Sequence, residues 1–286
     1  MFSVKAMLKM LVSLIVLVIA AVGCSRGGYV TTKNLKEIMI GRCWEYQRLV
    51  NPTPFLNNLK DCGALWELFY KAVSFKSSCG QQPVAYGEFT QLAKHQIDGK
   101  RLLLWEKVYP LVTKYADLGK RFVTLDSTLA GYMASSLVFC GNSNTADGLD
   151  YGKCPGYRDC PDNAFSAYWK EVSKEFSKMA EDPVYKMVNG SQSPTYRADS
   201  IFAEWELPYL PRDKVKTIRI MVVHNIHGPV VETCSSGATL SMMKNAIQSY
   251  GFNVECEDDP EAIHHFLCVD AVDTEACKNH VKRYIR

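Results

Sequence analysis

Cysteine usage constrains this chain of 286 residues most, because it contains eleven cysteines. Residues 1–24 have the layout of a secretory signal peptide: Lys5 and Lys9 without an acidic residue, an apolar run over 10–22, then small residues. Its removal takes Cys24 away and leaves ten cysteines, an even number that indicates disulfides in a secreted chain. A zinc site is the weaker interpretation, because no CxxC pair or suitably spaced histidine pair occurs. We therefore expect five disulfides.

The same N-terminal segment decides where the protein is expected. The segment would direct the chain into the secretory pathway, and after cleavage the protein would be secreted or kept in the lumen of vesicles or granules. Without cleavage the segment would be a membrane anchor, but its run of 13 residues, apolar except for Ser13, falls short of the ~20 that span a bilayer. The sequon Asn189-Gly190-Ser191 predicts a glycosylated Asn189 on the surface.

Composition and missing motifs exclude several classes of protein. The net charge of +3 falls to about +1 without the two leader lysines, and no basic block occurs, so no nucleic-acid partner is expected. With 11% aromatic and only 22% charged residues, the chain is not disordered. The sequence has no GxGxxG, GxxxxGK[ST], HExxH or GxSxG motif, and we expect no bound metal.

The first half of the chain has mostly helical periodicity, and the second half changes character. Residues 217–224 and 252–256 are expected strands on either side of a helix over 238–251, which makes a βαβ unit with parallel pairing. Residues 101–105 and 184–188 are two further strand candidates. Helices are expected over 34–50, 61–75, 86–96, 109–119, 124–138 (capped by Thr124) and 164–180. The fold class is therefore α+β, with a helical part and a small, mostly parallel four-stranded sheet.

Candidate chemistry rests on carboxylates among aromatic residues. Glu206 follows Phe202 and Trp205, and Asp126 falls in the first turn of the expected helix over 124–138. A carboxylate in an aromatic pocket has a raised pKa or stabilises a cationic transition state. The residue types alone favour core and helix-cap roles. They also leave open a sugar-active enzyme that uses Asp126 and Glu206 as a carboxylate pair.

Seven segments together resemble the ADP-ribosyl cyclase / NAD glycohydrolase family, and most of all its soluble invertebrate ovotestis-type members. They run in family order from about residue 34 to 282. The matching strings are GRCWEY, DCGALWELFYKAVSFKSSC, TLDSTLAGYMASSLVFCG, CPGYRDCP, YKMVNGS, YRADSIFAEWELP and FLCVDAVDTEAC.

The resemblance implies a two-domain arrangement with the active site in the cleft between the domains. Residues 30–97 with 124–181 would form a helical-bundle domain, and 98–123 with 182–286 the sheet domain with flanking helices. It also implies five disulfides: Cys43–Cys62, Cys79–Cys160, Cys140–Cys154, Cys234–Cys256 and Cys268–Cys277. Family members often form homodimers, so a homodimer stays open.

The resemblance also implies roles for individual residues. The catalytic glutamate falls on Glu206 and a second catalytic acid on Asp126, where TLDSTL has a shorter carboxylate than the family pattern TLEDTL. Ser127 takes the place of the acid that usually follows. We expect Glu106, which follows a wall tryptophan, to point away from the diphosphate of the substrate. The substrate-binding residues would be Trp105 and Trp169, as aromatic walls, with Ile201 and Phe202.

The activity implied by the resemblance is cleavage of the nicotinamide–ribose bond of NAD. The products would be nicotinamide with cyclic ADP-ribose, a messenger in calcium signalling, or with ADP-ribose, and NADP would undergo base exchange. NAD and NADP are substrates here, and no cofactor is expected. Two alternatives stay open: an NAD glycohydrolase with little cyclisation, and a catalytically inactive secreted binding module.

Overall fold

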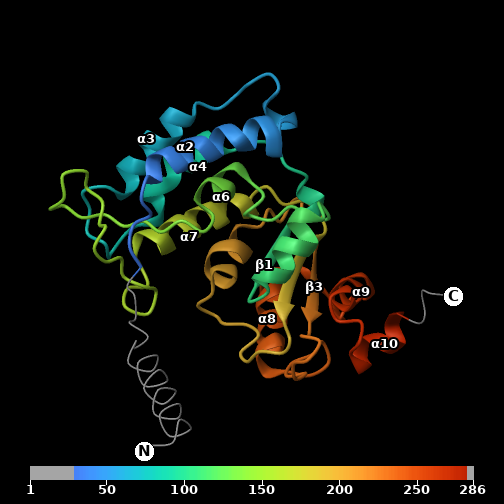
Figure 1. The fold of residues 1–286 in the computed structure, drawn as a ribbon. Coiled ribbons are helices and arrows are strands. Elements are labelled where there is room, and N and C mark those ends of the chain that lie inside the picture. The colour runs from blue at the N-terminus through green and yellow to red at the C-terminus, as the bar shows by residue number, and fades with distance from the viewer. Residues whose placement is uncertain (1–28, 282–286) are drawn as a thin grey trace, which may run out of the picture.

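A computed structural model describes residues 29–281 as a group of helices beside a four-stranded sheet (Figure 1). The expected signal peptide, with Cys24, lies outside the described residues. Within residues 29–281, no helix has the length and apolar character needed to cross a membrane.

The helical part is built around one aromatic core. Phe139 packs edge-on against Phe69, with ring centroids 4.8 Å apart, and against Tyr168 at 5.5 Å. The Asp61 carboxylate accepts the backbone N–H groups of Gly63 and Ala64 and so caps one helix. The helices around this core are α2 (Leu35–Glu45), α3 (Cys62–Val73), α4 (Gly87–Ala93), α6 (Leu129–Ala134) and α7 (Ala164–Ser177).

The sheet confirms the prediction of four parallel strands. Its order is β1-β2-β3-β4, and every neighbouring pair is parallel. All four segments that the sequence indicated take part. The strands are β1 (Leu103–Glu106), β2 (Val184–Asn189), β3 (Thr217–Val223) and β4 (Asn253–Asp258).

Helices cover both faces of this sheet, as a parallel sheet requires. One face packs against α8 (Ala238–Ser249), and α8 connects β3 to β4 as the predicted βαβ unit. The other face packs against α5 (Tyr109–Val112) and α9 (Glu261–Val269). A last helix, α10 (Glu275–Val281), lies beside α9 in Figure 1. Ligands of such sheets bind beyond the carboxyl ends of the strands. Strand β1 ends at Glu106.

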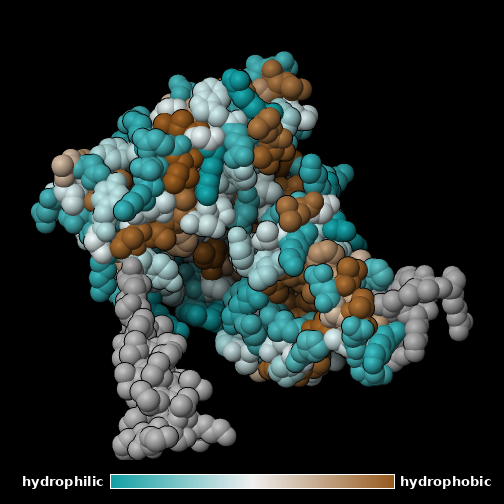
Figure 2. Space-filling model, viewed as in Figure 1, coloured by the Kyte–Doolittle hydropathy of each residue, from teal (hydrophilic) through white to brown (hydrophobic). Residues whose placement is uncertain are grey.

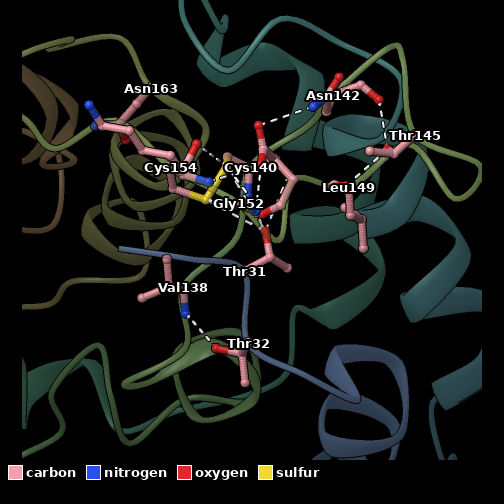
Figure 3. The surroundings of a disulfide bond; sticks show 12 residues. Thr31, Thr32, Val138, Cys140, Asn142, Thr145, Leu149, Gly152, Cys154 and Asn163 are labelled. Carbon is pink, nitrogen blue, oxygen red and sulfur yellow. Dashed lines mark hydrogen bonds between the residues drawn. A yellow bond between two sulfur atoms is a disulfide. The ribbon is translucent and has the colours of Figure 1, made fainter. Parts of the chain in front are cut away.

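The five disulfides confirm the pairing that the family resemblance implied. They join Cys43–Cys62, Cys79–Cys160, Cys140–Cys154, Cys234–Cys256 and Cys268–Cys277. Around the third bridge, the start of the described chain crosses two loops (Figure 3). The Thr31 hydroxyl accepts the N–H of Cys140 at 3.2 Å, and the Thr32 hydroxyl accepts that of Val138 at 3.0 Å. These hydrogen bonds therefore tie the start of the described chain to the loop that carries the disulfide.

The expected helix over 124–138, with Thr124 as its cap, is wrong. Helix α6 begins at Leu129, and its cap is Thr128, whose hydroxyl accepts the N–H of Gly131. Thr124 does not cap the helix, because its hydroxyl donates to the Asp117 carboxylate at 2.5 Å. Residues 124–128 form a turn instead, so Asp126 lies in that turn and not in the helix.

The expected surface position of Asn189 is also wrong. Asn189 ends β2 and is only 6% exposed. Its side-chain oxygen accepts the N–H of Ser191 at 2.8 Å, and its amide donates to the carbonyl of Lys107 at 3.4 Å. A glycan on the side-chain nitrogen would displace its contact with Lys107.

Gly131 fixes the turn that carries Asp126. A Cβ at Gly131 would collide with the carbonyl oxygen of Leu125 and approach the Cα of Asp126. We expect Gly131→Ala to lower the free energy of unfolding by about 1–3 kcal/mol, because the overpacked turn must move. Urea denaturation measures the change. Gly41→Ala in α2 is the matched control, since its Cβ meets nothing within 4 Å. Equal stability of the two variants would contradict this close contact.

Candidate active site

A pocket of about 740 Å³ collects residues from both parts of the fold. Its walls include residues of α7, the turn before α6, the loops around 135–140 and 154–157, β1, Lys186 of β2, and the segment 197–206. In the view of Figure 2, hydrophobic side chains are visible in a recess between the helices and the sheet. All the side chains predicted to bind or transform the substrate line this pocket: Trp105, Asp126, Trp169, Ile201, Phe202 and Glu206.

Glu206 is held inside the pocket by an unusual local backbone. It ends a π-helical turn over Phe202–Glu206, and a tighter turn over Leu207–Tyr209 follows, in which Pro208 has no N–H to continue the first. Glu206 is only 8% exposed. Burial raises its pKa to about 7, while the charge of Lys186 opposes the rise and that of Glu106 adds to it. Glu206 is therefore a carboxylate whose charge changes near neutral pH.

Trp105 and Trp169 reach the pocket from different elements. Trp105 lies on β1, with its ring 5.6 Å from that of Tyr109. Trp169 lies on α7, edge-on to Tyr168 at 5.3 Å and to Phe165 at 5.9 Å. No described residue accepts a hydrogen bond from the buried Nε1 of Trp169. The pocket thus offers aromatic surfaces to a flat ring.

Asp126 is the second carboxylate of the pocket. Burial raises its pKa, and a hydrogen bond with Ser135 partly offsets the rise. Burial also raises the pKa of the nearby Asp117, to about 6, although Asp117 is bonded to Thr124. Asp126 therefore provides a partly desolvated acceptor in the pocket, on a turn that the packing of Gly131 fixes.

Ile201 and Phe202 differ in exposure. Ile201 is 36% exposed, whereas Phe202 is 2% exposed and belongs to the core that covers one face of the sheet. The Phe202 ring centroid lies 4.2 Å from Nζ of Lys186, which is a cation–π distance.

Sequence reasoning missed Lys186 and gave Glu106 no role in the site. Lys186 is fully buried on β2, with Nζ 3.9 Å from Oε2 of Glu106. Glu106 lines the pocket, on the same face of the sheet as Leu104, the register partner of Lys186. The expectation that Glu106 points away from the diphosphate of the substrate stays a prediction. A lysine inside the apolar string VYKMV was the only signal available. In the described part of the chain, no group of three or more His, Cys, Asp or Glu residues is placed to hold a metal ion.

Comparisons with known proteins agree with this fold. The family model described as ADP-ribosyl cyclase matches residues 32–277. An "ADP-ribosyl cyclase/cyclic ADP-ribose hydrolase" from Aplysia californica is 34% identical over 261 residues, covering 90% of each chain. A mouse relative, "ADP-ribosyl cyclase/cyclic ADP-ribose hydrolase 2", is 37% identical over 84% of this chain and 75% of its own length.

A solved structure shows the same likeness in three dimensions. Aplysia cyclase, complexed with substrate NGD and product cGDPR, superposes with a TM-score of 0.80 at 32% identity. The match covers 87% of this chain and 98% of that one. A family model that spans most of the chain, together with relatives above 30% identity, identifies this chain as a member of the ADP-ribosyl cyclase family.

Proposed function

We propose that this pocket binds NAD and breaks the bond between nicotinamide and ribose. The observation that carries the proposal is a buried carboxylate, Glu206, in one pocket with Trp105 and Trp169. Product chromatography after incubation of the oxidised chain over 25–286 with NAD tests it. Release of nicotinamide supports the proposal, whereas intact NAD would favour the alternative of an inactive binding module.

The chemistry follows from the charge of the substrate. Nicotinamide in NAD is a cation, and it leaves as a neutral base, so no general acid is needed. The ribose that remains resembles an oxocarbenium ion, as in glycoside cleavage. A desolvated carboxylate stabilises such a cation strongly, because little water screens the charge. Glu206 is proposed to fill this role and to hold the ribose hydroxyls, without a cofactor.

The other pocket residues are proposed to orient the substrate. Trp105 and Trp169 would stack on the flat base, and Asp126 would accept a hydrogen bond from the carboxamide of nicotinamide. Phe202 and Ile201 would bound the ribose. Attack by an adenine nitrogen on the ribosyl cation gives cyclic ADP-ribose, attack by water gives ADP-ribose, and nicotinic acid gives base exchange on NADP.

A mainly hydrolytic enzyme is the second candidate. Ser127 occupies the position after the second acid, where its hydroxyl closes the turn with Thr124 at 2.9 Å. Asp126 also has a shorter side chain than the usual glutamate. Both features alter the contacts of the leaving base. Cyclisation requires the adenine to stay folded over the ribose, so a pocket that holds this folded form less well favours attack by water.

Three further parts of the proposal rest on the sequence. They are the division into two domains with the site in their cleft, passage through the secretory pathway, and a role of the product in calcium signalling. The two hydrophobic cores that meet at Leu125 support the first. The disulfides support the second, because they persist in oxidising compartments.

Replacing Glu206 tests the proposed stabilisation of the cation. Glu206→Gln keeps the size of the side chain and removes its charge, so we expect turnover of NAD to fall by about 10²–10⁴-fold. Nicotinamide release measures it, with circular dichroism to verify the fold. Glu67→Gln, at an exposed ion pair with Lys36, is the control for the same chemical change. Near-normal turnover in Glu206→Gln would remove Glu206 from the mechanism.

The raised pKa of Glu206 predicts a pH dependence. Its carboxyl group is an anion above pH 7 and neutral below, since its pKa is about 7. Only the anion stabilises a cation, so kcat/KM for NAD should fall about tenfold per pH unit below pH 7. Steady-state rates from pH 5 to 9 measure this, with circular dichroism at each pH. If kcat/KM stays constant down to pH 5, the ionised form of Glu206 is not required for catalysis.

Asp126 is expected to influence which product forms. Asp126→Glu restores the longer side chain, so the ratio of cyclic to linear ADP-ribose should change more than the total consumption of NAD. Chromatographic separation of the two products measures the ratio. Asp213→Glu, on the exposed surface outside the pocket, controls for the added methylene. An unchanged ratio would exclude Asp126 from product control.

A further inference from the structure

Lys186 and Glu106 form a buried charge pair within the wall of the pocket. Lys186 is fully buried, and the Glu106 side chain is 16% exposed, with 3.9 Å between Nζ and Oε2. Neither atom has a hydrogen bond to any residue in the described range 29–281. The other neighbour of Nζ is the face of Phe202, the residue that begins the turn ending at Glu206.

Stability alone does not account for this pair. Taking an ammonium and a carboxylate out of water costs several kcal/mol per ion, and a pair without further hydrogen bonds regains that only in part. The register partners of Lys186 on the neighbouring strands are Leu104 and Ile220, so an apolar residue would fit the pattern of this face. The pair therefore calls for an explanation in the chemistry of the pocket.

The two charges act on Glu206 in opposite directions. The positive charge of Lys186 lowers the pKa of Glu206, and the negative charge of Glu106 raises it. In return, Glu206 and then Glu106 raise the pKa of Lys186 against the effect of its burial. In the structure, Nζ of Lys186 lies 3.9 Å from Glu106 and 4.2 Å from the centroid of the Phe202 ring, which begins the turn of Glu206, and all three charged side chains line the same pocket.

We propose that Lys186 and Glu106 are positioning residues that together set the ionisation of Glu206, and with it the pH range in which the pocket is active. The inference rests on the proposed function, in which the anionic form of Glu206 is required. Lys186 keeps the buried carboxylate from remaining protonated at neutral pH. Glu106 limits that effect, so that Glu206 titrates near neutrality and not as an ordinary acid.

Other charged groups around the pocket are placed differently. On α7, which packs against the turn of Glu206, Lys174 and Lys178 are tied to Glu171 and Glu175 at 2.6 Å. Ser173 is the α7 residue that contacts Glu206, and it lowers the pKa of that carboxyl group. The remaining ionisable side chains of the pocket are Tyr29, Lys107, Tyr109, Asp126, Tyr157, Lys170, Arg197, Asp199 and Glu204. None of these is among the causes of the Glu206 shift.

The test compares three variants by the acid limb of kcat/KM against pH. In Lys186→Met the limb should move to higher pH by about one unit or more, and in Glu106→Gln to lower pH, because opposite charges have been removed. The double variant Glu106→Gln/Lys186→Met should return most of the way to the wild-type position. Lys71→Met, which removes an exposed ion pair with Glu88, is the control and should leave the limb unchanged.

A second readout does not depend on catalysis. Titration of the Glu206 carboxyl carbon by NMR in protein labelled with ¹³C-glutamate, assigned through Glu206→Gln, should show the same opposite shifts. The inference would be overturned if neither the acid limb of kcat/KM nor the Glu206 carboxyl titration moved in either single variant. It would also be overturned if the two single variants shifted in the same direction. If wild-type protein leaves NAD intact, the proposed function fails, and the carboxyl titration still decides whether the pair controls Glu206. If one single variant does not fold, the other and the double variant decide.

Discussion

The parallel pairing of β1 with β2 is the contact on which the pocket depends. It joins segments about eighty residues apart in the chain and sets Leu104 opposite Lys186 and Glu106 opposite Val188. Because the carboxyl ends of the strands point the same way, Trp105 and Glu106 emerge where α7 and the turn of Glu206 close over the sheet. A slip of one residue would move Glu106 to the opposite face and break up the charge pair.

Desolvation gives this pocket its chemical character. The apolar surroundings make a carboxylate expensive to ionise, and they also make an ionised one effective against a nearby cation. Lys186, on an otherwise apolar stretch of β2, favours the ionised form of Glu206, and the negative charge of Glu106 limits this effect. The aromatic rings of the pocket come from β1 and α7, and its charges come from β1, β2 and a π-helical turn.

Much of the architecture could be predicted from the sequence because its signals are local. The β-branched strands and the βαβ unit appear where periodicity placed them, and the family resemblance supplied the cysteine pairs. The errors came from competition between similar residues. Thr124 and Thr128 are both able to cap a helix, and the bond of Thr124 to Asp117 leaves the cap to Thr128. Lys186 escaped notice because a strand buried on both faces has no alternation that would reveal which face its lysine occupies.

The burial of Asn189 carries a consequence for the order of events during synthesis. Besides Ser191 and Lys107, its side chain reaches the amide oxygen of Asn225, which follows β3 and is made 36 residues later. Until β3 has emerged and paired with β2, the sequon is open to any enzyme that transfers glycans to nascent chains. In a cell that exports this protein, folding and glycan transfer would compete for the same side chain. A glycan on Nδ2 of Asn189 would displace the contacts of this nitrogen with Lys107 and Asn225, which follow β1 and β3.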